Sequence, residues 1–157
     1  MTYVNTGDEA RQPTLIFFWI RSDSSPVLRN LTPIRNQKKM KALLIVAHGS
    51  RQREANRFLE SLSAEIAAEA DGKFDMVESA FLQFNGPYAI DIIADLIEKG
   101  ADHIVVFPYF LSEGRHVLTD IPNLIQEAQV QYPGVVIEAR PMLGEIRGLK
   151  DLILDVV

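Results

Sequence analysis

The segment KALLIVA, residues 41–47, decides the fold, because it is an apolar run after its first lysine and ends at a histidine. Such a run is typical of a strand buried in a parallel sheet. His48 and Gly49 follow it directly. A second apolar run, IVVFPYFL at residues 104–111, leads through the turn SEGR to His116. Because open α/β sheets bind ligands at the carboxyl ends of their strands, both histidines are predicted to lie at that edge.

Strand and helix patterns alternate from Met40 to the end of the chain. Strands are predicted at residues 41–47, 74–82, 103–108 and 135–140, and helices at residues 52–70, 87–99, 120–131 and 145–156. This alternation indicates an α/β fold with a four-stranded parallel sheet and helices on both faces. The expected strand order is 2-1-3-4, as in flavodoxin-like proteins with right-handed crossovers.

Each predicted helix is expected to bury one apolar face. In the first helix this face comprises Phe58, Leu59, Leu62, Ile66 and Ala70, and in the last helix it comprises Leu149, Leu152, Ile153 and Val156. Ser50 is expected to cap the first helix, and Thr119 or Asp120 the third. Pro87 suits the first turn of the second helix.

The pattern divides the chain into residues 1–39 and residues 40–157. The first part contains three of the eight prolines, many serine, threonine and asparagine residues, and no sustained periodicity. It is interpreted either as a disordered or loosely attached extension or as a start-site artefact, with Met40 as the true first residue. We favour the second interpretation, although the apolar segment LIFFWI at residues 15–20 argues for an extra strand or a docking segment. Residues 40–157 are predicted to form one domain.

The composition is that of an ordinary globular protein, with 47% hydrophobic and 24% charged residues among 157. The net charge of −5 argues against a general nucleic-acid binder. No segment approaches the length of a membrane span, so no membrane partner is expected and the protein is predicted to be cytoplasmic. The absence of cysteine excludes thiolate catalysis and Zn–thiolate sites. A metal must therefore be held by histidine, carboxylate, carbonyl or water.

The turn HGSR, residues 48–51, is the first candidate site. Glycine permits close backbone approach, and a helix N-terminus attracts anions. The alternative is a tight turn with a surface histidine, and a phosphate site is weakly supported because no Gly-rich phosphate motif is present.

The loop YFLSEGRHV, residues 109–117, is more specific. Its aromatic residues flank a polar turn that carries an acid, an arginine and a histidine. Such a rim suits a flat, conjugated ligand, because aromatic rings stack. The alternative is that Tyr109 and Phe110 only cap the core. His103, the third histidine, begins a strand at the opposite edge and is expected at the surface.

Three segments resemble the short-form class II sirohydrochlorin chelatases, the small cobalto- and ferrochelatases: VAHGSR at 46–51, AFLQ at 80–83, and FPYFLSEGRHVLTDIP at 107–122. The resemblance covers Met40 to Val157. It implies that the fold is a chelatase half-domain. It also implies an enzyme that inserts Co²⁺ or Fe²⁺ into sirohydrochlorin without ATP in cobalamin or siroheme biosynthesis. The metal is then a substrate, and no tightly bound cofactor is expected. Because the long forms hold two similar halves around one cleft, this single half is expected to form a homodimer.

The resemblance assigns the catalytic and metal-binding roles to His48 and His116. Neutral imidazole binds Co²⁺ and Fe²⁺ and accepts protons near neutrality. The residues predicted to bind the tetrapyrrole are Gly49, Ser50, Arg51, Gln83, Tyr109, Ser112, Glu113, Gly114 and Arg115. Among these, Arg51 and Arg115 are expected to pair with substrate carboxylates, and the amides of Gly49 and Ser50 to bind another.

Gln83 departs from the family pattern, which often has glutamate at this position. Glutamine neither takes a proton nor carries charge. Three alternatives follow: the two histidines suffice, Glu113 or another carboxylate substitutes, or activity is weakened. A non-catalytic tetrapyrrole- or metal-binding protein of the same fold is the alternative function. A phosphotransfer enzyme is disfavoured, because Ala47 stands where histidine phosphatases carry arginine. A binding domain without chemistry also fits the architecture.

Overall fold

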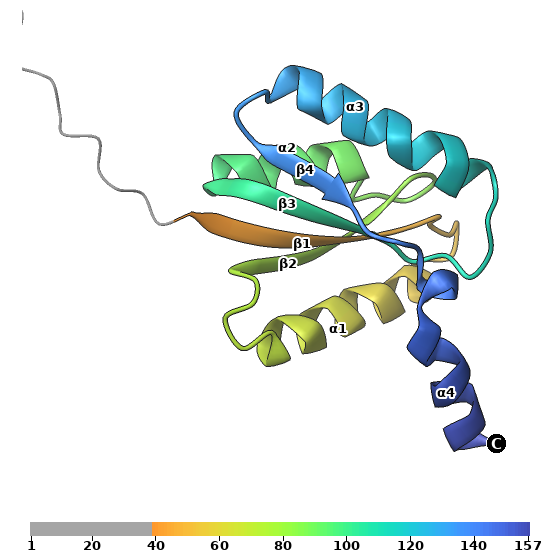
Figure 1. Ribbon diagram of the computed structural model, residues 1–157. Coiled ribbons are helices and arrows are strands. Elements are labelled where there is room, and N and C mark those ends of the chain that lie inside the picture. Colours follow the sequence, from red (N-terminus) through yellow and green to blue (C-terminus); the bar gives the residue numbers. More distant parts are fainter. Residues whose placement is uncertain (1–38) are drawn as a thin grey trace, which may run out of the picture. The chain divides into compact units, whose positions relative to one another are not determined.

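The structure, a computed structural model, describes residues 39–157. Its sheet has four parallel strands in the order β2-β1-β3-β4 (Figure 1), which confirms the predicted fold class and strand order. The strands are β1 (Met40–Ala47), β2 (Met76–Phe81), β3 (Ala101–Pro108) and β4 (Val136–Ala139). The prediction for residues 1–39 lies outside the described residues, apart from Lys39.

Helices cover both faces of the sheet, as predicted. They are α1 (Arg53–Glu69), α2 (Ala89–Glu98), α3 (Ile121–Gln131) and α4 (Arg147–Val156). Helices α2 and α3 lie over one face, and α1 lies over the other (Figure 1). No helix in the described part of the chain combines the length and the apolar character that crossing a bilayer requires.

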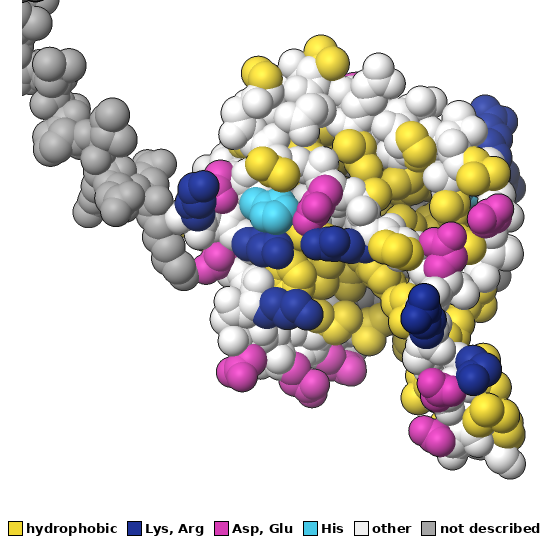
Figure 2. All heavy atoms as spheres, viewed as in Figure 1, with side chains coloured by type: hydrophobic (Ala, Val, Ile, Leu, Met, Phe, Trp, Pro, Cys, Tyr) yellow, Lys and Arg dark blue, Asp and Glu magenta, His cyan; other side chains and the backbone are white. Residues whose placement is uncertain are grey.

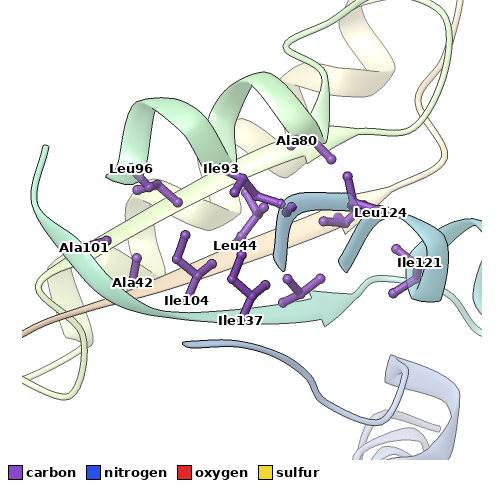
Figure 3. Packing of buried hydrophobic residues seen from close by; sticks show 14 residues of the cluster. Ala42, Leu44, Ala80, Ile93, Leu96, Ala101, Ile104, Ile121, Leu124 and Ile137 are labelled. Atoms are coloured by element: carbon purple, nitrogen blue, oxygen red, sulfur yellow. The ribbon is translucent and has the colours of Figure 1, made fainter. Parts of the chain in front are cut away.

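The main core lies between the sheet and helices α2 and α3 (Figure 3). Leu44 of β1 and Ile104 of β3 point into it, and both are fully buried. Ile93 of α2 and Leu124 of α3 close it from the helix side. Burying a side chain of this kind contributes about 1.5–3 kcal/mol, so this layer fixes the strands and hence the positions of their carboxyl ends.

A smaller cluster on the other face joins α1 to the sheet through Ile45, Leu59 and Phe81. The prediction that Phe58 faces inward is wrong, because 63% of its surface is exposed. The buried stripe of α1 is Asn56, Leu59 and Ser63, and Phe58 lies one helical step away from Leu59. A step of about 100° carries its ring out of the stripe.

The helix starts differ from the sequence predictions. Gln52, not Ser50, precedes α1, and the Ser50 hydroxyl accepts a hydrogen bond from the Gln52 amide at 3.1 Å. The second helix begins at Ala89, after Pro87. Asp120 does not cap α3 with its side chain, because a π-helical turn, His116–Asp120, runs directly into α3. That turn places the Asp120 side chain beside a histidine instead.

The prediction that α4 buries an apolar face within the domain is wrong. No residue of α4 is buried, and Leu152, Ile153 and Val156 are 60%, 52% and 75% exposed. Figure 1 shows α4 extending away from the sheet. A short 3₁₀ turn, Leu143–Glu145, precedes it and directs it outward.

Candidate functional site

Three strand ends meet at one edge of the sheet and bring the predicted site residues together. His48 follows β1, Gln83 follows β2, and Tyr109 follows β3. Backbone hydrogen bonds extend the sheet past the strand ends: the Gln83 amide donates to the His48 carbonyl at 3.0 Å, and the Tyr109 amide donates to the Val46 carbonyl at 2.8 Å. The turn after β1 is therefore fixed between its two neighbours.

His48 and His116 lie side by side at this edge. Their ring centroids are 4.4 Å apart, and the ring planes make an angle of 57°. The two residues are 68 positions apart in the chain, so the fold brings them together. Both rings are half-buried, which leaves them accessible at the edge.

Asp120 anchors His116. Its carboxylate oxygen Oδ2 is 2.6 Å from Nδ1 of His116. A histidine ring nitrogen can donate to a carboxylate, and with Nδ1 engaged in this contact Nε2 is the ring nitrogen left for a ligand. Ligating histidines usually have such a partner on the other nitrogen, because it fixes the tautomer and the orientation of the ring.

His48 has the opposite feature, a nitrogen without a partner. Its Nδ1 is buried and makes no hydrogen bond, the one such side-chain atom among residues 39–157. The Phe84 ring packs against the imidazole in a T-shaped arrangement, with centroids 5.3 Å apart and planes at 72°. A buried polar atom without a partner is unfavourable, and a ligand or a metal ion would satisfy it.

Gly49 is required by the tight turn after His48. Its φ of +91° lies in the left-handed region, and a Cβ there would collide with the Gln83 carbonyl oxygen. A residue with a side chain would therefore not fit at position 49.

Two asparagines hold the turn that follows. Asn56, buried in α1, accepts a hydrogen bond through Oδ1 from the Ser50 amide at 2.9 Å. The Asn85 side chain donates to the carbonyls of Ser50 and Arg51 at 3.3 Å and 2.9 Å. The prediction that the Ser50 amide is free for a substrate carboxylate is therefore wrong, because Asn56 already occupies it.

Charged and aromatic side chains form the rim. The Arg51 guanidinium lies 5.2 Å from the centroid of the Phe84 ring, within the range of a cation–π contact. Phe110 stacks on His116, with centroids 6.0 Å apart and planes at 23°. The remaining predicted loop residues, Ser112, Glu113, Gly114 and Arg115, are exposed beyond Phe110, and the Gln83 side chain is also exposed.

A cavity of about 270 Å³ adjoins His48, Gly49 and Ser50, and its lining also includes residues of α1 together with Tyr109 and Phe110. Sites for small ligands usually enclose about 300–1,000 Å³. This cavity is therefore small for a macrocycle, and His116 does not line it.

His103 lies at the opposite edge, as predicted. Its Nε2 is 3.1 Å from Oε1 of Glu138, which also accepts a hydrogen bond from Arg140 at 2.8 Å. This histidine is therefore separate from the site.

Comparison with known proteins identifies the family. Residues 42–157 match the sequence model of the CbiX family. The chain belongs to this family.

Among relatives of this CbiX chain, the chloroplastic sirohydrochlorin ferrochelatase of Arabidopsis thaliana is 36% identical over 115 residues, which are 73% of the chain and 48% of that protein. A sirohydrochlorin cobaltochelatase of Saccharolobus islandicus is 35% identical over 103 residues, which are 63% of the chain and 77% of that protein. The sirohydrochlorin chelatase SirB from Bacillus subtilis subspecies spizizenii, solved in complex with cobalt, superposes with a TM-score of 0.65 at 26% identity. That match covers 74% of this chain and 49% of SirB. The chain thus spans about half the length of the plant relative and of SirB.

Several residues of the candidate site were not predicted from the sequence. Asp120 was assigned to a helix cap, although its spacing of four from His116 is the spacing of two contacting residues on a helix. Phe84 follows the segment AFLQ, but nothing in the sequence placed its ring against His48. Asn56 and Asn85 gave no signal, because the sequence does not show which carbonyls and amides need a partner.

The candidate site offers few ligands for a metal. Within residues 39–157, no group of three or more histidine, aspartate, glutamate or cysteine side chains is arranged to hold an ion. Two imidazoles leave several coordination positions open. An open site suits an ion that is passed on, whereas closed four-ligand sites suit a structural ion.

Proposed function

We propose that this CbiX-family protein is a sirohydrochlorin chelatase, a lyase that inserts Co²⁺ or Fe²⁺ into sirohydrochlorin without ATP in cobalamin or siroheme biosynthesis. The observation that supports it most is the His48–His116 pair, with centroids 4.4 Å apart at the ligand-binding edge of the sheet. The names of the relatives support the substrate and both metals. The metal is a substrate, and no resident cofactor is proposed.

The reaction exchanges one divalent ion for two protons. The metal loses water ligands and binds four ring nitrogens, and two pyrrole N–H groups release their protons. Imidazole serves both needs, because its neutral form binds first-row divalent ions and accepts protons near neutrality. Two protein ligands hold the ion only until the ring nitrogens replace them.

Asp120 orients His116 in this scheme. Its hydrogen bond to Nδ1 holds the imidazole so that Nε2 is available to the ion. His48 supplies the second nitrogen, and Phe84 limits the rotation of its ring. The pair is thus preorganised for an ion that lies between the two rings.

The rim residues bind the tetrapyrrole. Arg51 and Arg115 pair with peripheral carboxylates, and each charge-assisted contact is worth about 1.5–3 kcal/mol. Phe84, Tyr109 and Phe110 offer apolar ring surface to the macrocycle. Gly49 contributes its backbone only, because the Gln83 carbonyl fills the space of a Cβ there. Ser50 contributes its hydroxyl rather than its amide, which Asn56 occupies.

The protein acts as a homodimer in this proposal. The cavity of about 270 Å³ beside His48 is small for a macrocycle, and the chain matches only 48% of the plant relative. A second copy supplies the opposite wall. The cytoplasmic location stays a prediction; the plant relative is named as chloroplastic.

Gln83 favours one alternative, a protein that binds the metal or the tetrapyrrole without catalysis. The residue is exposed at the site, and an amide there is a weaker base than a carboxylate. This alternative predicts that the protein binds the metal or the tetrapyrrole but does not accelerate metal insertion.

An insertion assay separates the two. The purified chain is mixed with sirohydrochlorin and with Co²⁺ or Fe²⁺ in separate reactions, and the absorbance of the metallated ring is followed. We expect a rate at least about 100-fold above the protein-free background with one of the metals, the lower range for acid–base catalysis. If the chain binds the metal or the tetrapyrrole but insertion proceeds at the protein-free rate, the non-catalytic alternative holds.

A further inference from the structure

Asn56 is a polar side chain in the interior of the domain, where such groups are rare. No Lys, Arg, Asp or Glu side chain among residues 39–157 is buried, and Figure 2 shows many of them at the surface of one face. The buried polar residues are Asn56, Ser63 and Ser79. The Ser63 hydroxyl donates to the Leu59 carbonyl of its own helix, whereas the Asn56 amide makes its hydrogen bonds outside α1. Buried polar groups with all their partners in place fix one arrangement of the segments that they join.

The Asn56 side chain joins the turn after β1 to the turn after β2. Its Oδ1 accepts a hydrogen bond from the Ser50 amide at 2.9 Å, and its Nδ2 donates to the Asn85 carbonyl at 3.2 Å. Asn85 strengthens the connection, because its own Nδ2 donates to the carbonyls of Ser50 and Arg51. This set of hydrogen bonds is here called the asparagine clamp. Neither turn can shift alone without breaking part of it.

The turn after β2 holds Phe84 in a conformation that a bulky residue rarely adopts. Its φ of +66° lies in the left-handed region. The Tyr88 hydroxyl donates to the Phe84 carbonyl, and the clamp fixes the next residue, Asn85. Strained residues persist where the surrounding contacts over-determine them, and they cluster at functional sites. The clamp is one of the contacts that keep Phe84 in place.

The clamp reaches His48 by two routes. One is the backbone, because Ser50 is two residues after His48. The other is the Phe84 ring, which packs on the imidazole with centroids 5.3 Å apart. Nδ1 of His48 has no hydrogen-bond partner, whereas Nδ1 of His116 has the Asp120 carboxylate. The ring of His48 is therefore oriented by packing and by its turn, and both depend on the clamp.

We propose that Asn56 is a positioning residue for metal binding: it locks the turns after β1 and β2 together, so that Phe84 holds the His48 imidazole toward the ion. The inference rests on the metal-binding role proposed above for His48. The role explains why the residue is an asparagine, because Ser50 offers an N–H group and Asn85 offers a carbonyl oxygen. An amide accepts from the first and donates to the second, whereas a carboxylate only accepts.

Titration with Co²⁺ tests the positioning role. Asn56→Ala removes the acceptor and the donor, and we expect an affinity about 10- to 100-fold lower, as for other residues that orient a metal ligand. The visible absorbance of the bound ion at saturation should shift from the wild-type spectrum toward that of His48→Ala. Ser63→Ala is the matched control, because it removes one buried hydrogen bond from the same helix without touching either turn, and it should keep the wild-type affinity and spectrum. Equal effects of the two alanine variants, whether large or absent, would overturn the proposal.

Two milder variants keep the test decisive if Asn56→Ala does not fold. Asn56→Asp retains an acceptor for the Ser50 amide and loses the donor to the Asn85 carbonyl. Asn85→Ala removes the half of the clamp that starts from the turn after β2. Each should lower the Co²⁺ affinity, and the double variant should lose less than the product of the two single effects, because both break one unit. Wild-type affinity in both single variants, or effects that multiply, would overturn the proposal.

The wild-type titration separates this proposal from the function on which it rests. A wild-type protein that binds no Co²⁺ would refute the metal-binding role of His48 and the positioning role of Asn56 together. A wild-type protein that binds and inserts Co²⁺, with Asn56 variants that keep its affinity and spectrum, would refute the positioning role alone.

Discussion

Oδ2 of Asp120 lies 2.6 Å from Nδ1 of His116, one turn away on the same π-helical segment. The contact ties the orientation of a candidate metal ligand to the start of α3, so the ligand is held by the fold and not by the exposed loop before it. Helical segments of the π type often occur at functional sites. The relationship leads to the first prediction.

Replacing Asp120 should weaken metal binding without unfolding the protein. Asp120→Ala removes the partner of Nδ1, and losses of about 10- to 100-fold in metal affinity are typical for such changes. Asp120→Asn keeps an acceptor oxygen and should lose less. Titration with Co²⁺, followed by the visible absorbance of the bound ion, measures the affinity. Asp91→Ala, which removes an exposed carboxylate from α2, is the control, and an equal effect of both alanine variants would contradict the role of Asp120.

Gly49→Ala should damage the site and the fold together. The added Cβ meets the Gln83 carbonyl, and φ of +91° is strained for alanine. We expect a loss of about 1–3 kcal/mol in the free energy of unfolding, measured in urea. Metal insertion should also slow, because relieving the collision shifts the turn and displaces His48. Gly134→Ala is the matched control, since a Cβ there has open space. Similar stabilities of the two variants would show that the turn tolerates a side chain.

Gln83→Glu should accelerate metal insertion. The residue is exposed beside the His48 turn, and a carboxylate there adds a base and a ligand. We expect a rise of at least about 10-fold in the insertion rate, below the usual range for a well-placed general base. Gln131→Glu, at the end of α3, adds the same charge away from the site. An unchanged rate in Gln83→Glu would mean that the two histidines suffice.

Two substitutions compare the stability contributed by a buried core residue, Ile93, with that of Phe58, which was predicted to be buried and is exposed. Ile93 is fully buried, so Ile93→Ala should lower the free energy of unfolding by about 2–5 kcal/mol. Phe58 is 63% exposed, so Phe58→Ala should change it by less than about 1 kcal/mol. Urea unfolding of both variants checks this. A larger loss for Phe58→Ala would place its ring in a contact that the described residues do not show.

The sheet was predictable because buried strands and their order leave a strong sequence signal. Strand and turn positions follow from the apolar run at residues 41–47 and from the glycine after each of the first two helices. The right-handedness of the crossovers then leaves few possible strand orders. Once the order was known, His48 and His116 had to share an edge. The resemblance to chelatases then gave the family, which the match at residues 42–157 confirms.

The details that failed depend on tertiary contacts. The stripe on α4 was predicted to be buried because periodicity shows which face is apolar but not what covers it. The pairing of Asp120 with His116 depends on a π-helical turn, which has no clear sequence signal. Phe84 reaches His48 from a residue with φ of +66°, a conformation that the sequence did not indicate. The meeting of the two histidines at one edge was thus predictable, whereas the contacts that hold each ring were not.

The most direct test of the central claim compares histidine variants in the insertion assay. His48→Ala with His116→Ala removes the pair whose centroids are 4.4 Å apart, whereas His103→Ala removes the histidine at the opposite edge. The account predicts that the double variant, still folded by circular dichroism, inserts metal no faster than the protein-free background, and that His103→Ala keeps the wild-type rate. A double variant that inserts metal at the wild-type rate would contradict it.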